Sequence, residues 1–306
     1  MSVAAITRLR GTREWLLSEI PVSRRQAALG SAYRHWLQFR RNGLAVTGLV
    51  IVSVLVLAAL AAPLLATHSP DAQELTRRLQ PPSPGNLLGT DELGRDLFSR
   101  LLYGGRVTLG IVVLIVIMVV PVGLAVGTFA GYHGGWVDRM FMRVTNIFLA
   151  FPRLVLALAF VAAIRPGVTS VIVAIALTTW PSFALLARSE TLAIRNADFI
   201  AAVRLTGASS FRVVVRHVMP LCVPSMIVRA SLETSGIVMT AAGLGFLGMG
   251  AQPPTAEWGA MIATSRGFLL QQWWVPTIPG LAILVASLGF NLLGDGLRDV
   301  LDPKQD

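Results

Sequence analysis

The sequence contains a single lysine, a single cysteine and few charged residues for its length. Charged residues make up 14% of its 306 residues, whereas soluble proteins carry about 25%. A phosphate-binding P-loop needs a lysine that reaches the nucleotide phosphates, and Lys304 lies in Asp-Pro-Lys-Gln, which is no such loop. Cys222 alone forms no intrachain disulfide, and the four histidines lack the spacing of metal ligands. We therefore expect no ATP site and no metal site in this chain.

The hydrophobic residues occur in long blocks, and they make up 54% of the sequence. Residues 42–67 contain no charged residue, which is enough to cross a hydrocarbon core about 30 Å thick. This block starts too late, and is too long, for the apolar segment of a cleaved signal peptide. The sequence therefore predicts an all-α polytopic membrane protein with about six transmembrane helices.

Six blocks are expected to span the membrane. We place these spans at about residues 44–66, 107–130, 140–164, 168–187, 221–247 and 276–296. Before the second span, Thr90 is expected to cap a short helix whose apolar face holds Leu93, Leu97 and Leu101. That helix is expected to lie along the membrane surface.

The arginines set the expected orientation. They are most frequent in the N-terminal tail and in residues 188–220, and positively charged loops stay in the cytoplasm. Both termini are therefore expected to be cytoplasmic. The predicted organisation is a cytoplasmic tail (1–43), a first span (44–66), an external segment with the surface helix (67–106), a five-span core that contains the 188–220 loop (107–297) and a second cytoplasmic tail (298–306).

The segment from residue 198 to residue 220 predicts two short helices joined by a turn. Gly207 is expected to end the first helix, as glycine often does. Ser209 or Ser210 is expected to begin the second helix, which runs towards Pro220. Small side chains in the first helix allow another protein to approach closely.

This segment resembles the cytoplasmic loop of ABC importer permeases, in which Glu-Ala-Ala is followed by three residues, a glycine and a stretch that ends in Leu-Pro. Ala202, Gly207 and Pro220 match the middle alanine, the glycine and the proline. Three residues replace the glutamate, the last alanine and the leucine of that pattern: Ala201, Val203 and Met219. The resemblance implies that the loop docks in a groove of an ATPase subunit, and the replaced glutamate puts one salt bridge to that subunit in question.

Further stretches resemble permeases of the dipeptide, oligopeptide and nickel group. They follow one another in the order of that family over nearly the whole chain, at residues 88–100, 131–136, 245–254 with 257–259, and 290–303. The long N-terminal tail and first span are similar to the second permease type of these systems. The dipeptide branch is the most similar, through residues 244–258 and 299–303.

The resemblance implies an ABC importer permease fold and one permease subunit of an ATP-driven importer of dipeptides or short oligopeptides in the inner membrane. It also implies a different second permease, two ATPase subunits that bind ATP and Mg, and an external solute-binding protein. The chain itself would then carry no cofactor and no catalytic residue. The coupling-loop residues implied by the resemblance are Ala201, Ala202, Arg204, Gly207, Ala208, Ser209, Arg212, Arg216, His217 and Pro220.

Charged residues inside the expected spans form a second candidate site. Arg229 and Glu233 are four residues apart in one helix, so their side chains share a face and can pair. Pro152 and Arg153 interrupt the third expected span, and proline kinks or breaks a membrane helix. One interpretation is a structural ion pair near the contact with the second permease. The other is that these charges border the translocation path, and that Arg153 or Arg229 attracts the carboxylate end of a peptide.

Other functions remain open at this point. An ion-driven secondary transporter of small solutes would need no ATPase, but it would leave the 188–220 loop without a purpose. The same ABC architecture can also serve nickel-chelate import. A membrane enzyme would need a cluster of titratable residues, which the sequence does not offer. Nucleic acid is not expected as a partner, because arginines beside spans set the orientation against membrane lipid.

Overall fold

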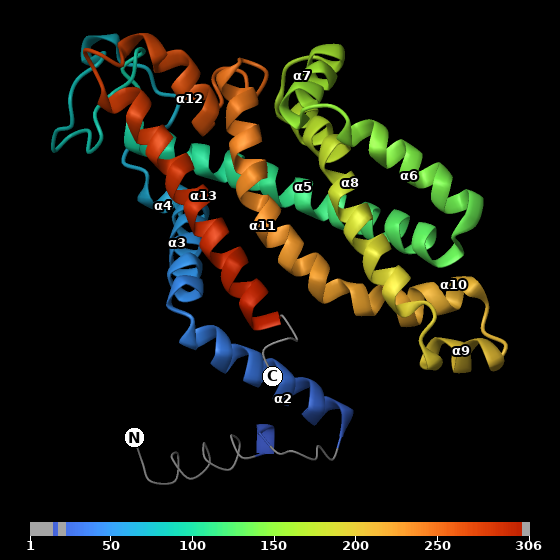
Figure 1. The fold of residues 1–306 in the computed structure, drawn as a ribbon. Coiled ribbons are helices and arrows are strands. Elements are labelled where there is room, and N and C mark those ends of the chain that lie inside the picture. Colours follow the sequence, from blue (N-terminus) through green and yellow to red (C-terminus); the bar gives the residue numbers. More distant parts are fainter. Residues whose placement is uncertain (1–14, 18–22, 302–306) are drawn as a thin grey trace, which may run out of the picture.

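The computed structural model describes residues 15–17 and 23–301, and the remaining parts of both expected tails lie outside these ranges. The described part contains isolated β-bridges but no β-strand, so the predicted all-α fold is confirmed (Figure 1). Its α-helices are α2 (Arg24–Arg41), α3 (Gly43–Leu60), α4 (Ala62–Leu65), α5 (Leu97–His133), α6 (Gly135–Leu149), α7 (Arg153–Ile164), α8 (Val168–Ile194), α9 (Asp198–Leu205), α10 (Ser210–Val213), α11 (Met219–Phe246), α12 (Trp258–Ser265) and α13 (Trp274–Leu301).

Five helical segments are long and apolar enough to cross a membrane: α3, α5, α8, the continuous helix from α10 to α11, and α13. The pair α6 and α7 gives a sixth span if it is counted as one, although it is bent by 91°. The bend lies at Pro152, which has no N–H to donate and disfavours helical backbone at the preceding residue. The expectation of about six spans, with a break at Pro152, is confirmed.

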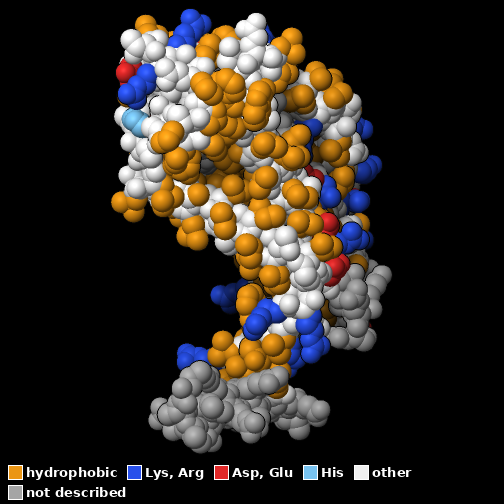
Figure 2. Space-filling model, turned by 90° about the vertical axis from the view of Figure 1, so that its left-hand side faces the viewer, with side chains coloured by type: hydrophobic (Ala, Val, Ile, Leu, Met, Phe, Trp, Pro, Cys, Tyr) orange, Lys and Arg blue, Asp and Glu red, His pale blue; other side chains and the backbone are white. Residues whose placement is uncertain are grey.

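The helices place two polar regions at opposite ends of the molecule. Helix α12 and the segment before α5 lie at the top of Figure 1, whereas α2, α9, α10 and the C-terminal end of α13 lie at the bottom. Between these ends, hydrophobic side chains cover the face shown in Figure 2, and Lys and Arg side chains gather above and below them. This distribution is that of a membrane protein, whose apolar band lies between two charged interfaces.

The prediction of a separate surface helix that begins at Thr90 is wrong. Gly94 has a φ of +72°, which a right-handed helix cannot contain. The hydroxyl of Thr90 is already used, because it accepts a hydrogen bond from the Gln80 amide at 2.9 Å and donates to the Arg77 carbonyl. The helix begins only at Leu97 and continues without a break to His133, so surface helix and second span are one element, α5.

Helices α5 and α8 approach each other closely because of three glycines. Gly123, Gly127 and Gly131 are spaced four residues apart on α5, so they lie on one face. A Cβ at Gly123 would overlap the side chain of Phe183, and a Cβ at Gly127 would overlap the backbone of Ala184. Small residues permit this kind of contact between membrane helices. Helix α5 reaches His133 and α6 starts at Gly135, so Gly134 alone joins the two helices.

Asp96 caps α5 and connects it to the segment before it. Its carboxylate accepts hydrogen bonds from the Ser99 amide at 2.8 Å, the Ser99 hydroxyl at 2.7 Å and the Asn86 side chain at 2.9 Å. Burial alone would raise the pKa of Asp96, but the hydrogen bonds from Asn86 and Ser99 outweigh it and hold the pKa below its usual value. The folded state therefore favours the ionised carboxylate.

Replacing Asp96 with alanine is expected to lower the free energy of unfolding by about 2 kcal/mol, because a charged helix cap is lost. Thermal unfolding in detergent measures this change, and Glu74→Ala, which removes an exposed ion pair with Arg77, serves as the control with a small effect. Since the pKa is lowered on folding, the contribution of Asp96 is present above about pH 4 and is lost as the pH falls through the folded-state pKa. Equal unfolding temperatures for Asp96→Ala and Glu74→Ala would contradict this role.

Candidate functional site

The loop between α8 and α11 forms a helix–turn–helix. Helix α9 ends at Leu205, and Gly207 has a φ of +79°, which favours glycine. Ser209 then caps α10, because its hydroxyl accepts a hydrogen bond from the Arg212 amide. The predicted end of one helix and start of the next are confirmed. The second helix does not stop at Pro220, however, because a π-helical segment, Val214–Val218, joins α10 directly to α11.

One side of this loop is packed against the ends of the membrane helices. Ile200, Val213, Val218 and Cys222 are fully buried and form a small hydrophobic cluster of their own. Half-buried side chains from α5 and α8, including that of Tyr132, pack against this cluster. The loop is therefore attached firmly to the membrane-spanning helices, so a displacement of the loop would also move them.

Polar contacts connect the same loop to the last turn of α5. Arg204 on α9 donates a hydrogen bond of 3.0 Å to the hydroxyl of Tyr132, and its guanidinium lies 4.9 Å from the centre of that ring. Arg195 donates to the carbonyl of Gly131 at 2.8 Å. The end of α5 and this loop, which are distant in the sequence, thus meet at one end of the bundle.

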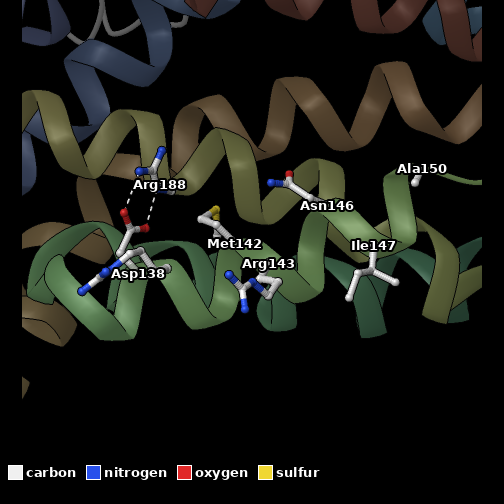
Figure 3. A pocket seen from close by; sticks show the side chains of 8 residues that line it. Asp138, Met142, Arg143, Asn146, Ile147, Ala150 and Arg188 are labelled. Carbon is white, nitrogen blue, oxygen red and sulfur yellow. Dashed lines mark hydrogen bonds and ion pairs between the residues drawn. The ribbon is translucent and has the colours of Figure 1, made fainter.

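An ion pair joins α6 to α8 beside this turn. Arg188 on α8 makes two parallel hydrogen bonds to Asp138 on α6, at 2.5 and 2.7 Å, a geometry of strong charge-assisted pairs. The carboxylate of Asp138 points towards Arg188 in Figure 3. A groove continues along α6 from this pair and is lined by Met142, Asn146 and Ile147.

The outer side of the loop is exposed. Most of the predicted coupling residues lie there, namely Ala201, Ala202, Arg204, Gly207, Ser209, Arg212, Arg216 and Pro220, whereas Ala208 and His217 are half-buried. Three large hydrophobic side chains accompany them: Phe199, Phe211 and Leu205, which is 90% exposed. Sequence reasoning missed these three residues, although large apolar side chains inside a polar, arginine-rich segment are a detectable signal. Such a patch indicates a protein-binding surface.

The charged residues of the spans meet in one cluster. Arg229 Nη2 lies 2.6 Å from Glu233 Oε1, as their spacing predicted, and Arg153 Nη1 lies 2.7 Å from Glu233 Oε2. Arg153 comes from the first turn of α7, directly after the bend, whereas the other two residues lie on α11. The side chains of Arg153, Arg229 and Glu233 are 29%, 40% and 15% exposed. The cluster is thus positioned by the protein but remains accessible.

Two sets of buried charged residues lie at the end of the molecule opposite the α9–α10 loop, and neither was predicted as a site. Arg95 Nε lies 2.6 Å from Asp91 Oδ2, and Arg100 Nε lies 3.3 Å from the same oxygen. Glu257 caps α12 by accepting hydrogen bonds from the Gly259 and Ala260 amides, and burial raises the pKa of this carboxyl above its usual value. Because each of these charges has partners, we assign them to the rigidity of this end. Among the described residues, no group of three or more His, Cys, Asp or Glu is arranged to hold a metal ion.

Comparison with known proteins agrees with this architecture. A family model described as "binding-protein-dependent transport system inner membrane component" matches residues 123–306. A second model, "N-terminal TM domain of oligopeptide transport permease C", matches residues 33–82. Solved structures of the inward-facing MetNI methionine ABC transporter have the same fold, with a TM-score of 0.54 at 19% identity, over 66% of this chain and 96% of theirs.

Several curated relatives are similar over nearly their full length. The probable D,D-dipeptide transport system permease protein DdpC of Escherichia coli K12 is 41% identical over 92% of this chain and 94% of its own length. The di/tripeptide transport system permease protein DppC of Pseudomonas aeruginosa is 42% identical, over 88% and 91%. The chain therefore belongs to the family of binding-protein-dependent transport system inner membrane components, and it is a multi-pass permease subunit of an ABC importer rather than an enzyme.

Proposed function

We propose that this chain is one of two different permease subunits of an importer that moves dipeptides or short oligopeptides across the inner membrane. Peptide as the substrate is supported by the relatives, whose names specify dipeptide transport at about 40% identity. The family and the fold favour this function over an ion-driven transporter. The substrate named by the relatives also favours it over nickel-chelate import.

The observation that carries the proposal is the exposed side of the α9–α10 loop. Leu205 and Phe211 are 90% and 65% exposed, next to Arg204 and Arg212. The outer side of the loop is apolar and cationic, and its inner side is packed against the membrane-spanning helices. Such a surface suits a groove of an ATPase subunit. Two such subunits would bind ATP and Mg. The predicted residues from Ala201 to Pro220 would transmit closure of the ATPases to the spans.

The proposed orientation places this loop, α2 and the C-terminal end of α13 in the cytoplasm. These elements lie at one end of the molecule (Figure 1), and α2 ends in Arg40 and Arg41, as expected of a cytoplasmic segment beside anionic lipid. The opposite end, with α12 and the segment before α5, would then receive peptide from an external solute-binding protein.

Co-expression with the genes next to that of this chain tests the proposal. We expect a purified complex that contains a second permease and two ATPase subunits, which are either two copies of one protein or two different proteins. In proteoliposomes, it should take up a labelled dipeptide only when ATP and the loaded binding protein are both supplied. Uptake that persists without ATP, or a chain that purifies alone and transports an ion-coupled solute, would refute the proposed function.

A further inference from the structure

The cluster of Arg153, Arg229 and Glu233 contains more positive than negative charge. Both arginines contact the same carboxylate, one on each oxygen. A structural ion pair needs one arginine for one glutamate, and an excess charge inside a membrane span is unfavourable without a partner. The second arginine is therefore the feature that a purely structural role does not explain.

Hydrogen-bonding groups of these arginines are also left over. The Nε of Arg229 is buried and has no hydrogen-bond partner among the described residues. Buried donors are normally paired, and an arginine can bind a carboxylate through two of its nitrogens. Since each arginine contacts Glu233 through a single terminal nitrogen, each has donors that another carboxylate could use.

The bend between α6 and α7 adds to this positive character. Arg153 stands in the first turn of α7, a helix of 12 residues whose N-terminus is not capped by a side chain. The N-terminus of a helix carries a partial positive charge, and broken membrane helices can present such ends to anionic substrates. The helix end and both arginines thus favour an anion at the same place.

Gly236 supports the position of Arg153. It lies one turn after Glu233 on α11, and a Cβ added to it would lie 2.8 Å from Nη2 of Arg153. The guanidinium therefore rests directly against the backbone of α11. A side chain at this position would require the end of the Arg153 side chain to shift.

We propose that Arg153 and Arg229, held in place by Glu233, bind the C-terminal carboxylate of a peptide during its passage through the membrane. This proposal rests on the proposed function, since it names the part of the peptide that this chain recognises. Glu233 holds both guanidinium groups while no peptide is bound. A carboxylate that arrives takes the terminal nitrogens that Glu233 does not use, and the partial exposure of all three side chains gives it access.

The experiment compares two forms of one dipeptide, with a free C-terminal carboxylate and with a C-terminal amide. ATP-driven uptake into proteoliposomes is measured at peptide concentrations that saturate the same binding protein, so that selectivity outside the membrane is held constant. We expect the wild-type complex to transport the acid about tenfold faster than the amide, the ratio expected of one charged hydrogen-bonded contact. The double substitution Arg153→Gln and Arg229→Gln should reduce this ratio to about one while uptake of the amide persists.

Gly236→Ala provides a variant that keeps both charges. Its Cβ should displace the guanidinium of Arg153 and give a ratio between those of the wild type and the double variant. Gly243→Ala, on the same helix, adds a Cβ 3.7 Å from Leu154, an ordinary contact, and should leave the ratio unchanged. Arg165→Gln, which removes an exposed charge at the other end of α7, should also leave it unchanged.

The remaining outcomes separate this proposal from the proposed function. Equal transport of acid and amide by the wild type would overturn the carboxylate site but not peptide import. An unchanged ratio in the double variant would also overturn it. Loss of the second permease when the double variant is purified would overturn it too, because the arginines would then serve the contact between subunits. If the wild type transports neither peptide with ATP, the proposed function itself fails.

Discussion

Replacing Leu205 and Phe211 with glutamate should reduce ATP-driven uptake at least a hundredfold, because the ATPase subunits no longer bind. These side chains are 90% and 65% exposed on the outer side of the α9–α10 loop. Burying one large hydrophobic side chain contributes about 1.5–3 kcal/mol, and 1.4 kcal/mol corresponds to about a factor of ten in affinity. Loss of two such contacts, each replaced by a carboxylate, should therefore lower the affinity for the ATPase subunits by more than a factor of a hundred. Co-purification of the ATPase subunits and peptide uptake measure the effect.

Two controls show whether this loss comes from the loop surface. Phe211 lies near Phe129, with ring centres 6.2 Å apart, so its replacement also disturbs packing on α5. The single variant Leu205→Glu avoids that contact and should still lower ATPase recovery at least tenfold. Leu270→Glu changes a leucine that is 97% exposed, between α12 and α13 at the opposite end, and should leave ATPase recovery intact. Full ATPase binding by Leu205→Glu would show that the loop is not the docking surface.

Local patterns were sufficient to predict the helical spans and one ion pair. Uncharged blocks identified the membrane helices, because a bilayer requires a long apolar segment. The spacing of Arg229 and Glu233 predicted their contact, since residues four apart share a helix face. Gly207 and the serines after it predicted the turn in the coupling loop. Each of these inferences depends on residues that are neighbours in the chain.

Contacts between distant segments were beyond this reasoning. Arg153 is 80 residues from Glu233 in the sequence, and only the bend before α7 brings it to α11. The start of α5 was placed wrongly because Thr90 and Asp96 are both good capping residues, and the choice depends on the partners of Thr90 and on the backbone at Gly94. The packing of α5 on α8, by contrast, had a signal in the sequence, three glycines at four-residue spacing.

Those glycines lead to the second large effect, which concerns stability. Gly127→Ala should lower the free energy of unfolding by about 3 kcal/mol or more, at the upper end of the cost of overpacking. The new Cβ would overlap the backbone carbonyl of Ala184 and crowd Ala187. A backbone atom within a helix cannot move aside as a flexible side chain can, so α5 and α8 must separate. Loss of the folded chain from detergent extracts on heating, measured by fluorescence-detected size exclusion, reports the change.

Gly110→Ala is the matched control for this prediction. Gly110 also lies within α5, but a Cβ there has no other atom within 4 Å. Alanine favours a helix over glycine by up to about 1 kcal/mol, so this variant should be as stable as the wild type or slightly more so. The two substitutions make the same chemical change in the same helix and differ only in what the new methyl group meets. If both variants unfold at the same temperature, the close approach of α5 to α8 does not determine the stability of this permease.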